Sequence, residues 1–176
     1  MKGILKQAAI GATAGAIAAF AMRQFVSLWH STGGQGAENG AFGLDREADV
    51  NAAQKLWQLL FRRNLTESDA EKVALALHYG HGALAGAGYA LLVNKNQKLQ
   101  AGFGTAYGAA LWLVGGEIAV TLARLSDPRS KSKASHMIAL AAHLVYGSAM
   151  ELSRRSLNSD FNSAVRHVRD RQFPSR

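Results

Sequence analysis

The sequence contains no cysteine, which excludes disulfide bonds, thiolate metal sites and thiol chemistry. It also contains no recognisable hydrolase triad, phosphate-binding loop, zinc-protease motif or nucleotide-binding fingerprint. Lysine and arginine number 20 against 12 acidic residues, a formal net charge of +8, but these bases form no single patch interleaved with aromatic side chains. These absences remove many enzyme classes and argue against a nucleic-acid partner. We therefore expect a noncatalytic protein.

Charge is almost absent from four windows of the chain, which are residues 3–22, 74–93, 101–123 and 134–150. Each window holds about 17 to 23 residues, and a helix of that length, at about 1.5 Å per residue, matches the roughly 30 Å hydrocarbon core of a bilayer. A soluble amphipathic helix would instead carry a charge every three or four residues on one face. The pattern predicts an all-α, polytopic membrane protein with a four-helix transmembrane bundle. Its spans are expected at about 3–25, 74–93, 101–123 and 134–152.

Two other interpretations of these windows stay open. Glycine and alanine lower the transfer free energy of each window, so a water-soluble all-helical domain rich in both would look similar. The first window also resembles a secretory signal, because Lys2 and Lys6 lie near its start and residues 19–21, Ala-Phe-Ala, could form a cleavage site. The small residues inside this window favour an uncleaved helix that packs against others.

The long loop between the first two spans, residues 31–73, is expected to contain a linker and a short helix. Residues 31–44 are polar and hold five glycines, which predicts a flexible connection. In residues 52–63 three leucines line one side, as in a helix lying at the membrane interface or in a connecting helix packed on the end of the bundle. Thr66 followed by Asp69 is an N-cap signature, so the second spanning helix is expected to begin near Glu67.

The C-terminal half completes a membrane domain of residues 1–157. Residues 94–100 form a short polar link, which makes the second and third spans antiparallel neighbours. Pro128, within a basic turn, is expected to break the helix between the third and fourth spans. Residues 158–176 are expected to form a basic polar C-terminal tail, peripheral or loosely ordered.

Three windows hold two glycines four residues apart, a spacing that places both on one helix face. These pairs are Gly11 and Gly15, Gly82 and Gly86, and Gly104 and Gly108. Lipid supplies no hydrophobic drive between helices, so close backbone approach through small residues provides the packing contacts. The pairs are expected to pack helices within the chain, with a dimer interface as the alternative.

Ionisable residues at membrane depth are costly and usually face the interior of a bundle. By helical rise, His81, Glu117 and His143 should lie at similar depth on three helices. Two imidazoles and a carboxylate could bind a divalent metal or relay protons, and two histidines on facing helices could ligate haem axially. The simpler interpretation is interhelical hydrogen bonding with no cofactor. Glu151, near a span end, is expected to pair locally or to snorkel.

The fourth window carries a recognisable string, His143-Leu144-Val145-Tyr146, then Glu151-Leu152 and Arg154-Arg155. With Gly88-Tyr89 ten residues after His78, it resembles the YagU-like bacterial inner-membrane proteins. The resemblance implies a multi-span inner-membrane protein and assigns no biochemical activity. The chain departs from the family at Glu117, where a histidine is expected, and in its long loop.

The basic residues lie mainly beside the windows, as expected for membrane spans flanked by lysine and arginine. Their counts on the two sides are equal, and the acidic residues of the long loop favour cytoplasmic termini. The expected partners are the lipid bilayer and either a second copy of the chain or a larger membrane complex. Three functions follow as hypotheses: an accessory or interaction component, a proton- or metal-ion-conducting or sensing protein, and a bis-His haem protein.

Overall fold

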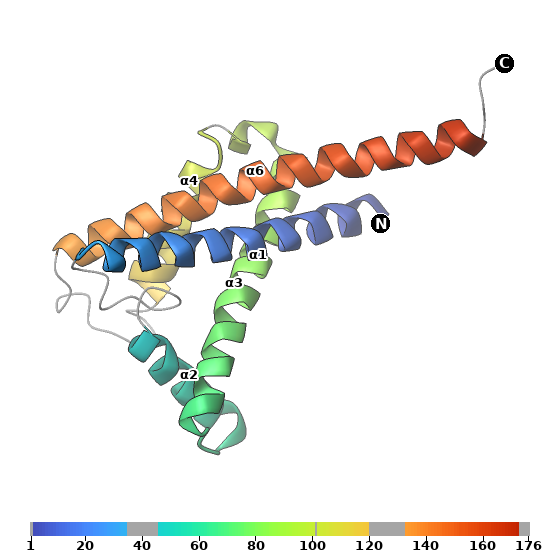
Figure 1. The fold of residues 1–176 in the computed structure, drawn as a ribbon. Helices are drawn as coiled ribbons and strands as arrows, with labels where there is room; N and C mark the ends of the chain where they lie inside the picture. The colour runs from blue at the N-terminus through green and yellow to red at the C-terminus, as the bar shows by residue number, and fades with distance from the viewer. Residues whose placement is uncertain (1, 35–45, 101, 120–132, 173–176) are drawn as a thin grey trace.

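The structure is a computed structural model, and it describes residues 2–34, 46–100, 102–119 and 133–172 (Figure 1). Its elements are α1 (Lys2–Ser31), α2 (Arg46–Phe61), α3 (Glu67–Lys95), the 3-10 helix η1 (Gln97–Gln100), α4 (Thr105–Leu111), the π-helix η2 (Trp112–Ala119) and α6 (Lys133–Gln172). Over these residues the chain forms helices and turns and no strand, which confirms the all-α prediction.

Helices α1, α3, α4 and α6 alternate in direction. Along α1 and α3 the contacts run in opposite order, with Gly11 against Gly86 and Gly15 against Gly82. Figure 1 shows α1 and α6 side by side and oppositely directed. The hydrogen bond from Gln7 Nε2 at the start of α1 to Asn158 Oδ1 late in α6, 3.1 Å long, agrees with that direction.

Helix α4 packs against α6, again in opposite order along the two helices. The backbone of Gly108 lies against that of His143, and Gly104 lies against Gly147. A Cβ added at Gly147 would lie 3.0 Å from the carbonyl carbon of Gly104. Real Cβ atoms are rarely that close, so both helices approach through bare backbone.

The glycine pairs of α1 and α3 meet each other within the chain. A Cβ added at Gly86 would lie 2.7 Å from the Cα of Gly15, and one added at Gly82 would lie 2.7 Å from the Cβ of Ala19. Neither position therefore accepts a side chain unless the helices separate. This geometry matches the expectation of packing inside one chain.

Gly104 differs from the sequence prediction. It was expected inside a spanning helix that began near residue 101, but α4 begins at Thr105 and Gly104 is its N-cap, with φ at 80°. Only glycine adopts this left-handed backbone without strain. Gly104 and Gly108 still both contact α6, so the spacing identified an interface although the helix boundary was wrong.

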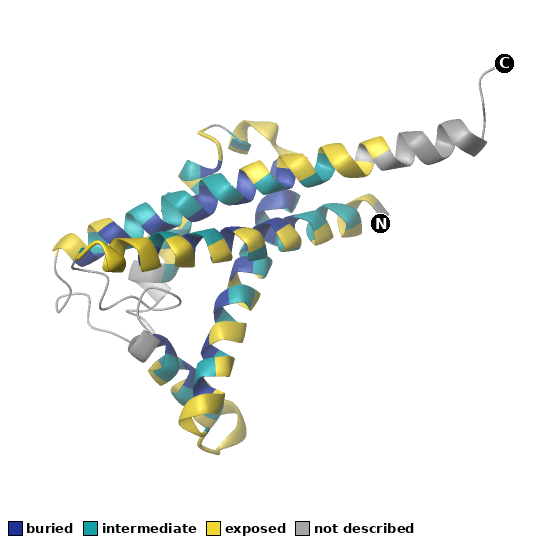
Figure 2. Cartoon of the chain, viewed as in Figure 1, coloured by how far each residue is buried: buried dark blue, intermediate teal, exposed yellow. Residues whose placement is uncertain are grey.

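Small side chains make up much of the interior of the structure. Ala14, Ala18 and Ala142 are fully buried, as are the larger Met150 and Tyr89, whereas many other large apolar residues are exposed. Figure 2 shows buried and exposed residues alternating along the helices. Leu84 is 76% exposed and Met137 is 71% exposed. The chain therefore packs by close helix approach and leaves much of its apolar surface uncovered.

Helix α2 differs from the predicted 52–63 helix by beginning at Arg46 and ending at Phe61. It packs on α3, where Ala53 and Ala70 are both fully buried. The Gln54 amide bonds the backbone of Leu65 on both its N–H and its carbonyl. Most of the predicted 31–44 linker lies outside the described residues.

The ends of α3 and α6 also bear on the predictions. Helix α3 begins at Glu67, and its N-cap Thr66 accepts a hydrogen bond from the backbone N–H of Asp69, as the sequence indicated. Helix α6 continues to Gln172, so the predicted tail is, as far as residue 172, an extension of the helix and not a loose segment. Pro128 lies outside the described residues.

Among the described helices, α1 alone is long and apolar enough to cross a membrane, over Gly3–Ser31. The apolar stretch Thr105–Gly115 is shorter. The four predicted spans thus correspond to helical segments, of which one meets the length and hydropathy expected of a span.

Candidate functional site

The predicted cluster of His81, Glu117 and His143 is placed in part. His81 on α3 is exposed and His143 on α6 is half-buried, and the two imidazoles are near enough to interact electrostatically. Glu117 lies in η2, with its side chain outside the described residues. The structure therefore brings the two histidines near each other but does not give the third member of the site.

His143 has one ring nitrogen occupied. Its Nδ1 lies 2.8 Å from the carbonyl oxygen of Ala139, one turn earlier in α6. A backbone bond of this kind fixes the orientation of histidines that bind metals. Among the described residues, however, no group of three or more histidine, aspartate or glutamate side chains is arranged to hold a metal ion.

His78 contributes to helix packing. It is buried, and its Nε2 lies 3.1 Å from the carbonyl oxygen of Ala19 on α1. It is also near enough to His143 to interact with it electrostatically. The His78 side chain thus forms a contact between α3 and α1.

Two tyrosines bond backbone carbonyls across helices, beside the glycine contacts. Tyr146 on α6 donates to the carbonyl oxygen of Gly82 at 2.7 Å, and Tyr107 on α4 donates to that of Ala85 at 2.8 Å. A helical carbonyl has a second lone pair, so it can accept these bonds and keep its intrahelical bond. The sequence did not predict either hydrogen bond, because nothing in the spacing of the two tyrosines indicates a backbone carbonyl as their partner.

A second polar cluster surrounds Glu151, which is fully buried on α6. Arg154 donates hydrogen bonds to both carboxylate oxygens of Glu151, from Nε to Oε2 at 2.8 Å and from Nη2 to Oε1 at 2.9 Å. Arg155 Nε also donates to Oε1. Local pairing of Glu151 agrees with the sequence expectation, but the carboxylate is buried and does not snorkel. The cluster carries two positive charges against one negative charge.

Tyr89 lies beside this carboxylate. Its hydroxyl is buried and close enough to Glu151 to interact electrostatically, yet it makes no hydrogen bond of standard geometry to the described residues. Its ring packs on that of Tyr107, with centroids 4.8 Å apart. Tyr89 therefore contributes a large buried ring to the junction of α3, α4 and α6.

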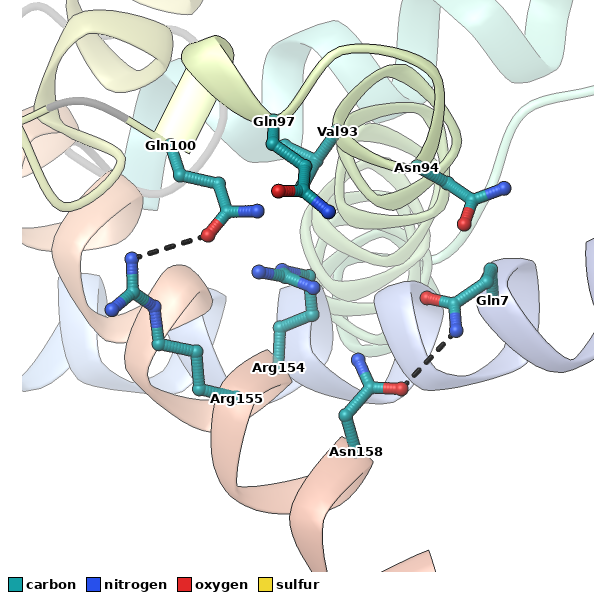
Figure 3. Close-up of a pocket in the computed structure, with 8 residues that line it drawn as sticks. All are labelled: Gln7, Val93, Asn94, Gln97, Gln100, Arg154, Arg155 and Asn158. Carbon is teal, nitrogen blue, oxygen red and sulfur yellow. Dashed lines mark hydrogen bonds between the residues drawn. The ribbon is translucent and has the colours of Figure 1, made fainter. Parts of the chain in front are cut away.

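A pocket of about 310 Å³ opens beside the arginines (Figure 3). Its lining consists of Val93, the two guanidinium groups of Arg154 and Arg155, and five amide side chains, with no carboxylate among them. The amides are those of Gln7, Asn94, Gln97, Gln100 and Asn158. In Figure 3 the Arg154 guanidinium lies centrally, with Gln97 above it and Gln7 and Asn158 on one side.

Two hydrogen bonds hold the rim of the pocket. Arg155 Nη2 donates to Gln100 Oε1 at 3.4 Å, and Gln7 Nε2 donates to Asn158 Oδ1 at 3.1 Å. The Arg155 guanidinium also stacks over Phe103, 4.7 Å from the ring centroid. The sequence did not reveal this site because its members come from α1, α3, η1 and α6, and no pattern in the sequence indicates that residues 7, 93–100 and 154–158 meet.

No protein-family model, curated protein or solved structure matches the chain.

Proposed function

We propose that this chain is a small, noncatalytic, multi-pass protein of the bacterial inner membrane, acting as an accessory or interaction component of a membrane assembly. The observation that carries the proposal is the distribution of side-chain size. Among fully buried residues the largest are Tyr89, Met150 and Glu151, while leucines such as Leu84 and Leu5 are mostly exposed. The resemblance to YagU-like proteins belongs to the same proposal.

This distribution suits lipid better than water. A soluble domain gains about 25 cal/mol for each Å² of apolar surface it buries, so it places leucine inside. A helix in lipid gains nothing from hiding leucine and instead packs through glycine, alanine and interhelical hydrogen bonds. The Gly82–Gly15 contact and the Tyr146 hydrogen bond are of this second kind.

Helix α2 fits the same placement. Leu59 and Leu60 on its free side are mostly exposed, although the helix is packed on α3. Trp57 stacks on Phe61 with ring centroids 4.3 Å apart, and aromatic side chains of this kind favour the headgroup region. These features support an interfacial position for α2.

Fractionation of cells producing the chain tests the membrane placement. The protein is expected in the membrane pellet and should stay there after an alkaline carbonate wash, which removes peripheral proteins. Release into the supernatant by carbonate, or a stable monomer in detergent-free buffer, would contradict the proposal.

The accessory role is tested by photo-crosslinking in intact membranes. A photoreactive residue at Leu84, exposed on α3, is expected to yield a discrete protein adduct, while one at buried Ala18 serves as the matched control. Adducts to lipid alone at Leu84 and at the other exposed leucines would contradict an interaction role.

A second candidate function is proton or metal-ion conduction or sensing through His81, Glu117 and His143. The proximity of the two histidines and the backbone bond that orients the His143 ring favour it. Ion flux into liposomes should then fall when His143 is replaced by alanine. Equal flux above background in the parent and in His143→Ala would remove His143 from any such mechanism.

A further inference from the structure

The pocket beside Arg154 and Arg155 has the chemistry of an anion site. Its lining offers guanidinium and amide N–H donors and contains no carboxylate. Glu151 lies behind the arginines, where it fixes their orientation but neutralises only one of their two charges. The residual positive charge faces a cavity in which a cation would be repelled.

Planar guanidinium groups match the paired oxygens of both phosphate and carboxylate groups. Arg154 is held rigidly, because its side chain is 9% exposed and two of its nitrogens are bonded to Glu151. Arg155 is 43% exposed and reaches the rim, where Gln100 and the Phe103 ring hold it. The site thus combines one fixed and one accessible guanidinium, so little ordering is needed when an anion binds.

The position of the pocket points to the source of the phosphate. Asn94, Gln97 and Gln100 directly follow the second predicted span, and Arg154, Arg155 and Asn158 follow the end of the fourth. In the proposed membrane placement this level is that of the lipid headgroups. Phe103, exposed beneath Arg155, and the exposed Leu99 offer apolar surface for the start of an acyl chain.

We infer that this pocket binds a phosphate group, and that its occupant is the phosphodiester headgroup of an anionic phospholipid. The choice of phosphate and of lipid as its source rests on the proposed membrane placement, whereas the preference for an anion rests on the pocket alone. A volume of about 310 Å³ admits a glycerophosphate headgroup and lies at the lower end of the roughly 300–1,000 Å³ typical of ligand pockets.

The test uses the full chain purified in detergent, with thermal unfolding followed as lipid is added. Phosphatidylglycerol in mixed micelles is expected to raise the unfolding midpoint with saturation, because a ligand that binds only the folded state stabilises it. Phosphatidylcholine should give no saturable shift. Parallel titrations with inorganic phosphate and with glycerol phosphate test whether the pocket binds a water-soluble phosphate compound instead of a lipid.

Two variants probe the pocket, and a third serves as control. Arg155→Gln removes the accessible charge, and Gln97→Glu places a carboxylate on the exposed rim with almost no change in shape. Each is expected to weaken phosphatidylglycerol binding about tenfold, the effect of losing one charge-assisted hydrogen bond. Lys72→Gln, which removes one positive charge from the opposite end of α3, should bind like the parent.

Several results would overturn the inference. Equal shifts with phosphatidylglycerol and phosphatidylcholine would do so, as would a phosphatidylglycerol effect unchanged in both Arg155→Gln and Gln97→Glu. In another outcome, glycerol phosphate binds saturably with the same affinity as phosphatidylglycerol and loses that binding in Arg155→Gln and Gln97→Glu. This result would support a phosphate site but would reject a lipid as the source of the phosphate. If carbonate washing releases the chain while phosphate binding persists, the membrane placement fails and the phosphate site stands.

Discussion

Tyr146 on α6 donates a 2.7 Å hydrogen bond to the carbonyl oxygen of Gly82, a residue of α3 whose backbone lies against Gly15 of α1. The bond connects α6 to the point where α1 and α3 approach each other through bare backbone. Because Gly82 has no side chain, its carbonyl is open to a neighbour on α6 while Gly15 covers it from α1. One residue thus joins three helices.

The first prediction compares two tyrosines that differ in their hydroxyl partners. Tyr146→Phe should lower the free energy of unfolding in detergent by about 1 kcal/mol, because it removes a buried hydrogen bond. Tyr89→Phe should cost less, since the Tyr89 hydroxyl interacts with Glu151 but makes no hydrogen bond of standard geometry to a described residue. Denaturant unfolding of both variants checks this. A larger loss for Tyr89→Phe than for Tyr146→Phe would contradict the assigned bonds.

The second prediction concerns two glycines of α3 that lie two residues apart. Gly82→Ala should destabilise the protein by about 1–3 kcal/mol, because its Cβ would lie 2.7 Å from that of Ala19 and force α1 away. Gly80→Ala meets no atom within 4 Å and should be neutral or stabilising by up to about 1 kcal/mol, since alanine favours helix. Thermal unfolding of both variants in detergent gives the comparison. Equal effects at the two positions would rule out the close α1–α3 approach.

Glycine spacing predicted the helix contacts because it depends on periodicity alone. Gly11, Gly15, Gly82 and Gly86 are four apart within their helices, and a shared face follows from 3.6 residues per turn. The N-cap at Thr66 was predictable for a similar reason, because capping is a local interaction. The boundary at Gly104 was not predictable, since glycine is compatible both with a helix and with the left-handed cap that it adopts.

The pocket beside Arg154 and Arg155 could not be predicted from the sequence. Gln7, Gln97 and Arg154 are far apart along the chain, and amide side chains carry no spacing rule that would connect them. The ion pair of Glu151 with Arg154 and Arg155 was accessible from sequence because residues three and four apart are neighbours on a helix. That the pair is buried was not, because burial depends on how η1 and α1 cover α6.

The third prediction concerns the acid sensitivity of the start of α3. Hydrogen bonds from Lys72 and then from Thr66 hold the pKa of the exposed Asp69 carboxyl below its ordinary value. A lowered pKa means that the carboxylate contributes stability above its ordinary pKa, and that this contribution is lost as pH falls through the lowered value. Asp69→Asn should therefore flatten the dependence of the unfolding midpoint on pH as the pH falls below the ordinary pKa of aspartate.

Lys72→Met provides the matched variant for this titration. It removes the first of the two partners and should return the pKa of Asp69 toward its ordinary value, which a carboxyl-detected NMR titration would record. A pKa for Asp69 that is unchanged by Lys72→Met would contradict the assigned cause.

The last prediction contrasts two ion pairs that differ in burial. Glu151 is fully buried and binds two arginines, whereas the Lys72–Asp69 pair is exposed, with 73% and 51% of its side chains accessible. Glu151→Gln should lower the free energy of unfolding by about 3 kcal/mol, because it leaves two guanidinium groups without their counter-ion in a confined site. Asp69→Asn should cost much less, because water screens the exposed pair. If the pocket binds phosphate, an anionic lipid should restore part of the loss in Glu151→Gln, because the added anion supplies charge to the same arginines. Chemical unfolding of Glu151→Gln and Asp69→Asn, with and without phosphatidylglycerol, measures the two losses in the free energy of unfolding and the recovery with lipid. Equal losses for the two variants would contradict a buried carboxylate at Glu151.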